Sequence, residues 1–421
     1  MACEPQKDIE VTAMDYHNAL DKLTEVMVYD IFSPPVASRV YAYPSIAAYE
    51  IVVQDSTNAY NSLSRQIDHF KPIPKPDKDI NHNMSAVMAY LNVGEQLIFS
   101  TQKMKAYKDS IYQNWSSSPK FEESLDYAKK VSQHVLKWAK KDNYAQTRTM
   151  PKFSINTDDP SRWVPTPPDY MDGIEPNWNK MRTFVLDSAS QFKPKRPTPF
   201  SMEKGSPFYK EVMEVYETVN KARELGDESE MIAIAQFWDC NPYVSTHKGH
   251  MMFATKKITP GAHWILINKI TSQKAGFDFA ETARSYAFLS IGIYEAFISS
   301  WDEKYRSNLI RPETLISQHI DQQWTPILQT PPFPEYTSGH SVVSGAASIV
   351  MNEIYGKDFY FKDTTEKPYG LPVRAFNSFD EAAEEAAISR LYGGIHYMPA
   401  IEVGLKQGRK VGHYVVKQIN L

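Results

Sequence analysis

Residues 285–312 of the chain read SYAFLSIGIYEAFISSWDEKYRSNLIRP. The segment from Ser285 to Trp301 is the nearest approach to a membrane-spanning helix. However, it does not reach the roughly 18 uninterrupted apolar residues that such a helix needs, and it carries Glu295. A run of this length and composition is typical of a helix buried in a protein core. We therefore predict a core helix here and no membrane span in the chain.

Apolar residues recur every three or four positions through most of the sequence, as they do along one face of an amphipathic helix. The pattern is clear in residues 121–142, and it recurs in residues 14–32, 45–60, 84–112, 209–223, 277–301, 338–355 and 378–392. Alternating strand patterns are scarce. The sequence therefore predicts an all-α protein.

A long proline-rich stretch divides the chain. We predict an N-terminal helical bundle over residues 1–150, an extended connector over residues 151–207, and a C-terminal helical bundle over residues 208–421 that carries the active site. Because the connector contains Trp163, Tyr170 and Trp178, we expect it to pack on the helices. The predicted architecture is two packed helical bundles.

The composition indicates a folded protein of balanced charge. Of 421 residues, 42% are hydrophobic, and 46 basic against 50 acidic residues give a net charge of -4. This balance argues against nucleic acid or an anionic membrane as the main partner. The two cysteines, Cys3 and Cys240, cannot supply a disulfide framework, a zinc finger or an iron–sulfur cluster.

Two weaker signals concern export and metal binding. The Ala2-Cys3 start resembles a lipoprotein processing site, which would make the protein exported, periplasmic or lipid-anchored; an incidental cysteine is the alternative. His247 and His250 have the spacing of a metal pair, but they lack further nearby ligands and are interpreted as surface or loop histidines.

The C-terminal third contains clear helix boundaries. Ser378-Phe-Asp-Glu381 has the form of a capping box at the start of a helix, and Gly393-Gly394 stands where that helix should end. Further on, Ala400, Gly404, Gly408 and Gly412 follow at four-residue intervals. Such a stripe of small residues on one helix face predicts the close approach of another element.

Three clusters of polar residues suit the binding of an oxyanion. Lys304 and Arg311 are seven residues apart, so on one helix they would project from the same face and could grip an anion. Next, Ser338, Gly339 and His340 precede a helical run, where unpaired backbone N–H groups favour an anion. A solvated basic face and an ordinary helix cap are the alternatives for these two clusters.

The third cluster contains Arg390 and His396. Six residues of unbroken helix would place them on different faces, but the glycine pair between them allows the two side chains to converge. A helix end with a buried histidine is the alternative. Together the clusters supply three cations, a hydroxyl and amide donor pair, and two histidines, a set that fits an oxyanion with charged oxygens.

These motifs resemble the signature of the superfamily shared by vanadium-dependent haloperoxidases and type 2 phosphatidic-acid phosphatases. That signature reads Lys-x6-Arg-Pro, then Pro-Ser-Gly-His, then Ser-Arg-x5-His-x3-Asp. Here its three parts are Lys304 to Pro312, Thr337-Ser-Gly-His340, and Ser389-Arg390 to His396. The match covers roughly the C-terminal third of the chain, while the helical pattern of the N-terminal half suits the double bundle of the soluble haloperoxidases.

The chain departs from the signature at two positions. Thr337 replaces the usual proline, and Ala400 stands where the superfamily has aspartate. The expected partner of the His396 ring is therefore missing from its usual place. A backbone carbonyl or Glu402 is a candidate to replace it.

The resemblance implies vanadate as cofactor, with phosphate able to occupy the same site, and hydrogen peroxide and a halide as substrates. It assigns His396 as the ligand of the metal, His340 as the residue that moves the proton and Lys304 as the group that polarises peroxide, so these three are the predicted catalytic residues. The predicted vanadate-binding residues are Lys304, Arg311, Ser338, Gly339, His340, Arg390 and His396.

Two other functions stay open at this stage. In a phosphatase, His396 would attack phosphorus to form a phosphohistidine and His340 would protonate the leaving alcohol. Alternatively, Ala400 could mark an inactive, anion-binding scaffold. The lack of a predicted membrane span disfavours the membrane-embedded lipid phosphatases, and the form of the segment from Pro332 to His340 favours a peroxidase.

The expected halide is iodide. Trp301 and Phe333 resemble aromatic positions near the halide site of haloperoxidases, with core packing as the alternative, and no extra histidine lies near Phe333. The chain resembles in particular the bacterial vanadium-dependent iodoperoxidases of marine flavobacteria. Asp302 and Tyr243 are candidates for residues that support the anion-binding side chains without binding the anion themselves. We also expect the protein to be a monomer.

Overall fold

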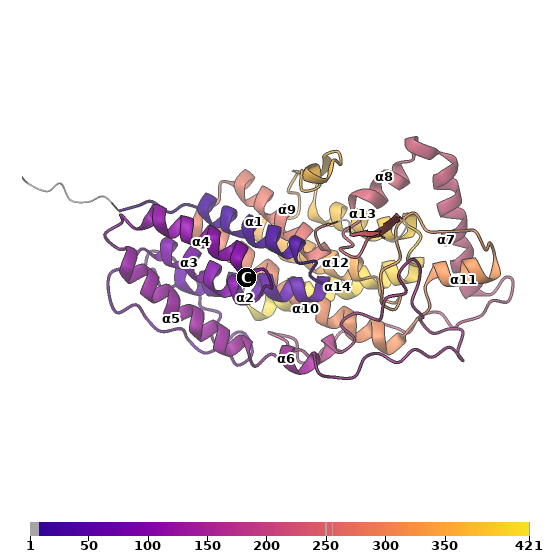
Figure 1. Cartoon of the computed structure of the whole chain (residues 1–421), viewed down its shortest axis with the longest axis horizontal. Helices are drawn as coiled ribbons and strands as arrows, with labels where there is room; N and C mark the ends of the chain where they lie inside the picture. The colour runs from indigo at the N-terminus through magenta and orange to yellow at the C-terminus, as the bar shows by residue number, and fades with distance from the viewer. Residues whose placement is uncertain (1–7, 249–250, 255, 421) are drawn as a thin grey trace, which may run out of the picture.

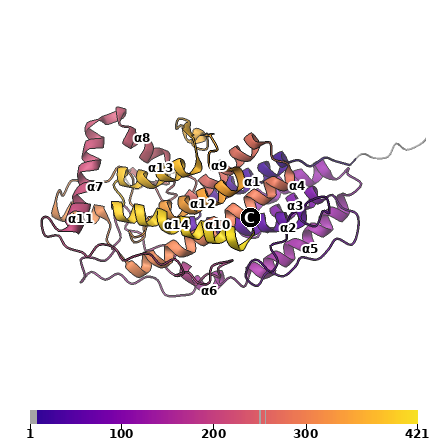
Figure 2. The same ribbon diagram turned by 180° about the vertical axis from the view of Figure 1, so that it is seen from behind.

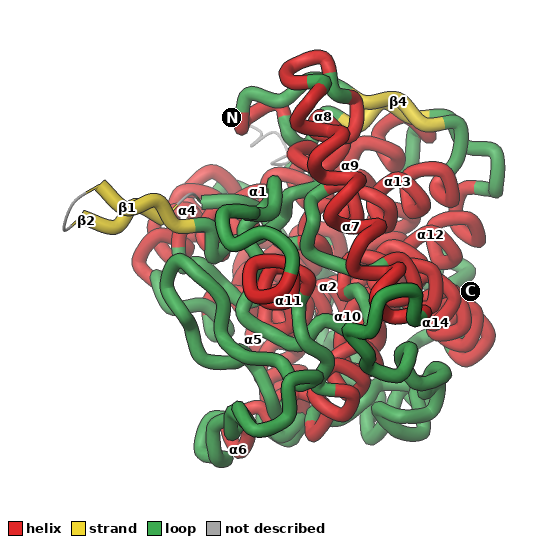
Figure 3. The backbone as a smooth tube through the Cα atoms, turned by 90° about the vertical axis from the view of Figure 1, so that its right-hand side faces the viewer, coloured by secondary structure: helices red, strands yellow, loops and turns green. Residues whose placement is uncertain are grey.

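The computed structural model describes residues 8–248, 251–254 and 256–420, without the side chains of residues 227, 245–248 and 251–254. The Ala2-Cys3 pair, His250 and the His247 side chain lie outside this description. The prediction of an all-α protein is confirmed, because fourteen α-helices account for most of the described residues. Between them lie two short antiparallel hairpins that the sequence did not indicate (Figure 3).

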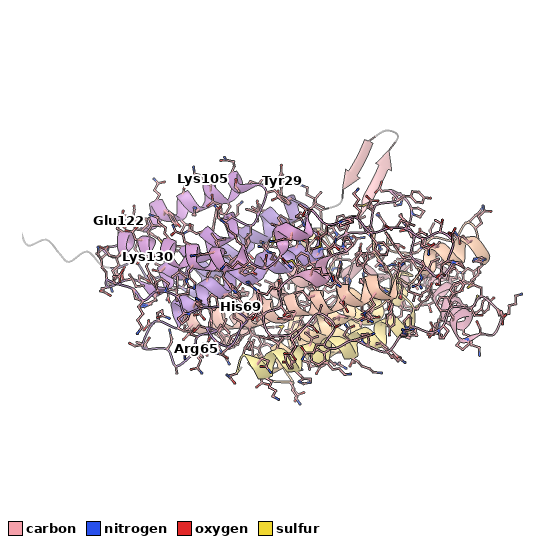
Figure 4. The ribbon with its side chains drawn as sticks, turned by 90° about the horizontal axis from the view of Figure 1, so that it is seen from below. Tyr29, Arg65, His69, Lys105, Glu122 and Lys130 are labelled. Atoms are coloured by element: carbon pink, nitrogen blue, oxygen red, sulfur yellow. The ribbon has the colours of Figure 1, made fainter. Side chains whose placement is uncertain are left out.

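The N-terminal helices gather at one end of the molecule (Figure 1). Several of them begin at recognisable caps: the Asn81 side chain, for example, accepts the N–H of Met84. The helices are α1 (Ala13–Tyr29), α2 (Pro34–Val52), α3 (His82–Glu95), α4 (Thr101–Trp115), α5 (Phe121–Ala139) and the short α6 (Tyr144–Thr147). Their outer faces carry charges of both signs, including Lys105, Glu122 and Lys130 (Figure 4).

Residues 151–207 run as an extended segment along the side of the molecule from α6 to α7, with one helical turn, η1 (Trp178–Lys180) (Figure 1). Trp163 and Trp178 are fully buried. Tyr170, which we also expected to pack, is 64% exposed. It follows a turn and has a left-handed backbone conformation, and most of its side chain remains accessible to solvent.

The C-terminal half contains the remaining helices and both hairpins. The helices are α7 (Pro207–Glu224), η2 (Gly226–Glu228), α8 (Glu230–Phe237), α9 (Pro260–Ala275), α10 (Phe279–Ser307), α11 (Pro312–His319), α12 (Gly339–Tyr355), η3 (Lys367–Tyr369), α13 (Phe379–Tyr392) and α14 (Met398–Gln418). The strands are β1 (Ser245–Lys248), paired with β2 (Met251–Ala254), and β3 (Phe361–Asp363), paired with β4 (Arg374–Phe376).

Helix α10 joins the two halves. It packs against α2 on one side and α12 on the other, and a single apolar core contains residues of both halves. The predicted core helix is therefore confirmed: Glu295, buried in its middle, accepts the backbone N–H groups of Phe184 and Val185 from the connector. In the described part of the chain, no helix has the length and apolarity to cross a membrane.

Helices α12 and α14 lie side by side, beside α10 (Figure 2). Their close contact agrees with the prediction from the stripe of small residues. A Cβ atom at Gly408 would lie 2.0 Å from the carbonyl oxygen of Val342, and one at Gly412 would lie 2.8 Å from that of Ala346. On the opposing helix, a Cβ at Gly345 would meet the Leu405 carbonyl oxygen at 2.6 Å. Only glycine therefore allows this contact, which fixes the beginning of α12 against α14.

Candidate active site

Three buried cations come together from three different elements. Lys304 lies in the last turn of α10, Arg311 is the residue that precedes α11, and Arg390 lies in the last turn of α13. The prediction that Lys304 and Arg311 share one helix is wrong. Asn308 adopts a left-handed conformation that ends α10, and the chain then turns so that Arg311 approaches the site from another direction.

The Lys304 ammonium is held by the loop before α12. Its Nζ donates to the carbonyl oxygens of Thr337 at 2.6 Å and of Pro334 and Glu335 at 3.2 Å each. All three N–H groups thus have a backbone acceptor. Lys304 contributes positive charge to the site, and direct contact with an anion requires it to release one of these bonds.

The two guanidinium groups are also fixed by backbone carbonyls. Arg311 donates from Nε to Phe333 at 2.9 Å and from Nη1 to Ile395 at 2.7 Å, and its buried Nη2 has no partner. Arg390 donates from Nη2 to the carbonyl of Trp238 at 2.7 Å. Planar groups held in this way present their remaining N–H donors in fixed directions, which suits recognition of an oxyanion.

Burial lowers the proton affinity of all three cations. It lowers the pKa of Arg311 and that of Arg390 to about 10. Burial and the nearby Arg311 hold the pKa of Lys304 well below its usual range. A multiply charged anion placed among them would offset this cost, so the electrostatics favour an anionic ligand.

The start of α12 supplies the donors that the sequence predicted. Ser338 is the N-cap residue, and its Oγ accepts the N–H of Ser341. Its own N–H donates to the carbonyl of Ala400 at 3.1 Å, which ties the start of α12 to α14. Gly339 faces the Trp301 ring, where an added Cβ would lie 3.5 Å from the ring edge.

His340 presents an unpartnered nitrogen to the same pocket. Its ring hydrogen-bonds to the backbone of Trp238, and the buried Nε2 has no partner. Burial and the charge of Arg390 hold the pKa of His340 well below its usual range, so the ring is neutral at pH 7. With the proton on the nitrogen that faces the Trp238 carbonyl, Nε2 can accept a proton.

His396 has a partner that the sequence did not identify. Its Nδ1 lies 2.7 Å from Oε1 of Glu335, which also accepts the N–H of Tyr397 at 3.0 Å. Neither predicted replacement for the missing aspartate makes this contact, since a carboxylate rather than a carbonyl occupies Nδ1 and Glu402 is exposed on α14. With Glu335 at Nδ1, Nε2 faces the cations and lies within hydrogen-bonding distance of Nη1 of Arg311, at 3.2 Å.

The Glu335 carboxyl group is fully buried. Burial raises its pKa to about 8, which favours the protonated form at pH 7, while Arg311 and Lys304 act in the opposite direction. The contact with Nδ1 at 2.7 Å fixes the orientation of the His396 ring, and the ionised form would also hold the His396 proton on Nδ1.

Replacement of Glu335 by glutamine is expected to weaken vanadate binding about 10- to 100-fold, the usual effect of losing the partner of a ligating histidine. Equilibrium dialysis or titration followed by ⁵¹V NMR measures this affinity directly. Glu402→Gln is the matched control and should change nothing, because Glu402 is exposed. Equal affinities for Glu335→Gln and the unaltered chain would show that Glu335 does not position His396.

The aromatic candidates border the site. The rings of Trp301 and Phe333 lie 5.1 Å apart, and Lys304 Nζ lies 4.9 Å from the centre of the Phe333 ring. Both rings line the pocket that contains Gly339, His340, Arg390 and His396. The core-packing alternative also holds in part, because both side chains are buried.

Tyr243 and Asp302, the two residues that we expected to support the site, differ in their position relative to the pocket. Tyr243 lines the same pocket as the histidines. Asp302 turns away from it: its carboxylate accepts Asn179 Nδ2 at 3.0 Å and pairs with Arg306. The structure therefore brings Tyr243, but not Asp302, to the pocket.

Of the segment 238–243, only Tyr243 was predicted to belong to the site. The Trp238 carbonyl holds both Arg390 and His340, and Cys240, Asn241 and Tyr243 line the pocket. The dense pattern Trp-Asp-Cys-Asn-Pro-Tyr between two helices is a signal that could have indicated it. Glu335 likewise stands three residues before Ser338, within the segment that suggested the second motif.

The residues fit a tetrahedral or trigonal oxyanion. Two buried atoms without partners, Arg311 Nη2 and His340 Nε2, belong to the same cluster of side chains. Gly339 leaves the backbone open beside them, and His396 Nε2, 3.2 Å from Arg311 Nη1, is an imidazole nitrogen that could bind a metal centre. This combination of fixed cations, helix N-terminus and imidazole fits an oxyanion such as vanadate.

Comparisons with known proteins agree with this geometry. Residues 284–420 match the family model of the VCPO second helical-bundle domain. The crystal structure of the first bacterial vanadium-dependent iodoperoxidase is 57% identical, with a TM-score of 0.94 and 98% of each chain covered. A comparison with curated protein sequences finds no match.

More distant structures share the fold. Holo-type and apo-type bacterial vanadium-dependent chloroperoxidase are each 14% identical, with TM-scores of 0.72 and 0.70, and the matches cover at least 98% of each chain. With the fold and the anion site in place, the match at 57% identity over nearly the whole chain shows that the protein belongs to the vanadium-dependent haloperoxidases.

Proposed function

We propose that this protein uses hydrogen peroxide to oxidise iodide to hypoiodous acid at a vanadate centre held by His396. The observation that carries the proposal is a buried cluster of three cations next to a histidine whose Nδ1 is held by Glu335 and whose Nε2 faces Arg311. The 57% identity to an iodoperoxidase supports both the cofactor and the halide.

The proposed roles in binding follow from the donors. Arg311 and Arg390 would bind the charged oxygens. Lys304 would add positive charge nearby while its ammonium group stays bonded to the backbone carbonyls. Ser338 and Gly339 would donate from the start of α12. His396 Nε2 would be the protein ligand of the metal, with Glu335 on the opposite ring nitrogen at 2.7 Å.

Vanadate, when bound, supplies a Lewis acid that activates hydrogen peroxide for attack by the halide. The protein residues prepare that reaction. His340, neutral and with Nε2 directed into the pocket, is positioned to accept a proton from peroxide and later to return it to the leaving oxygen. The buried cations stabilise the negative charge that develops on oxygen.

The apolar wall suits a large, weakly hydrated halide. Trp301, Phe333 and Phe297 line the pocket beside the histidines, and iodide loses less hydration free energy than smaller halides when it meets such a surface. It is also the easiest of the common halides to oxidise. We therefore assign iodide, rather than bromide or chloride, as the preferred halide.

Vanadate reconstitution tests the proposal. The protein freed of vanadate should gain iodide-dependent peroxidase activity when orthovanadate is added, and it should lose that activity when phosphate competes for the site. His396→Ala should abolish the activity, because it removes the proposed metal ligand that Glu335 positions, and His340 is not held in that way. His413→Ala, an exposed histidine on α14, is the control. Full activity in His396→Ala would refute the assignment.

The same preparation distinguishes the alternative functions. Hydrolysis of p-nitrophenyl phosphate that vanadate inhibits, without halide oxidation, would identify a phosphatase. The absence of both activities in protein that still binds vanadate would identify an anion-binding scaffold. Bromide oxidation faster than iodide oxidation would refute the halide assignment but leave the vanadate site in place.

Two further properties are part of the proposal. A monomer is expected, and light scattering should give a mass near 48.2 kDa.

Export with lipid attachment at Cys3 rests on the Ala2-Cys3 pair alone. Fractionation of the native cells, with mass spectrometry of the N-terminal peptide, tests it; an unmodified peptide in the cytoplasm would refute it.

A further inference from the structure

A second group of ligating side chains lies beside the anion site. Cys240 follows α8, His263 lies in the first turn of α9, and Glu366 lies between β3 and η3. One ligand atom from each, Sγ, Nδ1 and a carboxylate oxygen, lies within 4.8 Å of the other two. All three residues are buried, and the proposed peroxidase function gives none of them a chemical role, although Cys240 also lines its pocket.

We propose that Cys240, His263 and Glu366 bind one Zn²⁺ ion. The distance from Cys240 Sγ to His263 Nδ1 is 3.4 Å, and that from His263 Nδ1 to Glu366 Oε1 is 3.6 Å. Tetrahedral zinc with ordinary bond lengths to sulfur, nitrogen and oxygen separates such ligand atoms by about 3.4 to 3.6 Å. Two of the three separations therefore already match those that the ion would impose, and the third, from Cys240 Sγ to a Glu366 oxygen, is within 4.8 Å.

An unpartnered atom points to a ligand. Glu366 Oε1 is buried without a hydrogen-bond partner, although the side chain is only 5% exposed. A buried carboxylate oxygen in this condition is costly unless a cation or donor compensates it. The His263 ring, 3.6 Å from this oxygen, is just too far for a hydrogen bond, and Lys257 pairs with Asp239. A divalent cation between Glu366, Cys240 and His263 removes this cost.

The remaining nitrogen of His263 is arranged as metal sites require. Nε2 lies 2.7 Å from Oδ2 of Asp363, and the Asp363 carboxylate in turn accepts Thr365. A carboxylate on Nε2 raises the basicity of the ring and directs Nδ1 toward the Cys240 thiol, to which it hydrogen-bonds at 3.4 Å. A metal ion would replace this hydrogen bond with bonds to both atoms. The Trp238 ring stacks on His263, with centroids 4.5 Å apart, and so fixes the plane of the imidazole.

The chemistry of the donors favours zinc over harder ions. A thiolate and an imidazole disfavour Mg²⁺ and Ca²⁺, whereas zinc accepts sulfur, nitrogen and carboxylate oxygen together. Within the described residues, no fourth histidine, cysteine or acidic residue joins the group. The fourth position is therefore left for water.

The ion would connect three segments that are distant in sequence. Through Cys240 it would fix the chain next to Trp238, whose carbonyl holds Arg390. A zinc ion here would thus stabilise one wall of the peroxidase pocket without taking part in the reaction. The inference rests on the Cys240–His263–Glu366 geometry and does not depend on the proposed function.

Metal analysis of the purified full chain tests the site. After incubation with Zn²⁺ and desalting, the unaltered protein should retain one zinc per chain by mass spectrometry of the metal. Glu366→Gln and Cys240→Ser should each lower zinc affinity at least about tenfold, the lower end of the loss seen when even an indirect partner is removed. Glu295→Gln, a buried glutamate that also has an unpartnered oxygen, is the matched control.

Cobalt identifies the ligand atoms directly. Co²⁺ in place of zinc should give a thiolate charge-transfer band that Cys240→Ser abolishes and Glu366→Gln shifts. Because Glu366→Gln retains the thiol, it keeps the test valid if Cys240→Ser fails to fold. Unaltered protein that retains no zinc, or variants that bind zinc as the unaltered chain does, would overturn the proposal, whether or not the protein oxidises iodide.

Discussion

Replacement of His340 by glutamine is expected to lower kcat for iodide oxidation about 100- to 10,000-fold, the usual contribution of a positioned general acid or base. Glutamine has a similar reach, but it cannot accept a proton at the position of Nε2, which is buried and unpartnered in the structure. The measurement is steady-state kinetics with saturating vanadate, with vanadate affinity determined separately. Affinity should change far less than kcat.

The pH profile distinguishes proton transfer from simple anion binding. A neutral His340 accepts a proton and a protonated one does not, so the rate of the unaltered enzyme should fall as the pH drops through the pKa of His340 in the vanadate-bound enzyme. The His340→Gln variant should lack this acid limb. His413→Gln, on the exposed face of α14, should behave as the unaltered enzyme. If His340→Gln retained both the rate and the acid limb, another group would be the base.

Replacement of Gly408 by alanine is expected to destabilise the protein by about 3 kcal/mol, at the upper end of the cost of overpacking. The new methyl group would lie 2.0 Å from the Val342 carbonyl oxygen, so α12 and α14 must separate. Alanine improves helix propensity by about 1 kcal/mol, but this gain is smaller than the steric cost. Thermal unfolding followed by circular dichroism measures the change.

A helical glycine without this constraint serves as the control. A Cβ at Gly94 in α3 would meet only the Leu23 side chain, at 3.2 Å, and that side chain can move. Gly94→Ala should therefore be nearly neutral. Because Ser338 to His340 begin α12, Gly408→Ala should also weaken vanadate binding. Equal melting temperatures for the two variants would show that the helices can separate without cost.

Much of the fold was predictable because its signals are local. Helix spacing identified most of the long helices, and the glycine stripe of α14 predicted its contact with α12. The helix end before Arg311 was missed, since a left-handed Asn308 is a weak signal in sequence. The two hairpins were missed as well, because strands of three or four residues show too little alternation to recognise.

The candidate site shows the same division. The spacing of the motifs indicated the seven anion-binding candidates, and the structure places them in one cluster. The partner of His396 could not be derived, because Glu335 lies 61 residues away and the choice among several acidic residues depends on packing. Asp302 was a reasonable candidate because it follows Trp301 in sequence. However, its carboxylate contacts Arg306 and Asn179 and does not line the pocket.

The sequence by itself determined that the protein is helical, that its core helix contains Ser285 to Trp301, and which side chains could bind an oxyanion. These features depend on residue type and on spacing within one or two helical turns. The tertiary structure alone decided that Glu335 orients His396, that carbonyls of the loop before α12 hold Lys304, and that Cys240, His263 and Glu366 meet. Such contacts join segments far apart in the chain, and only the packing of the helices brings them together.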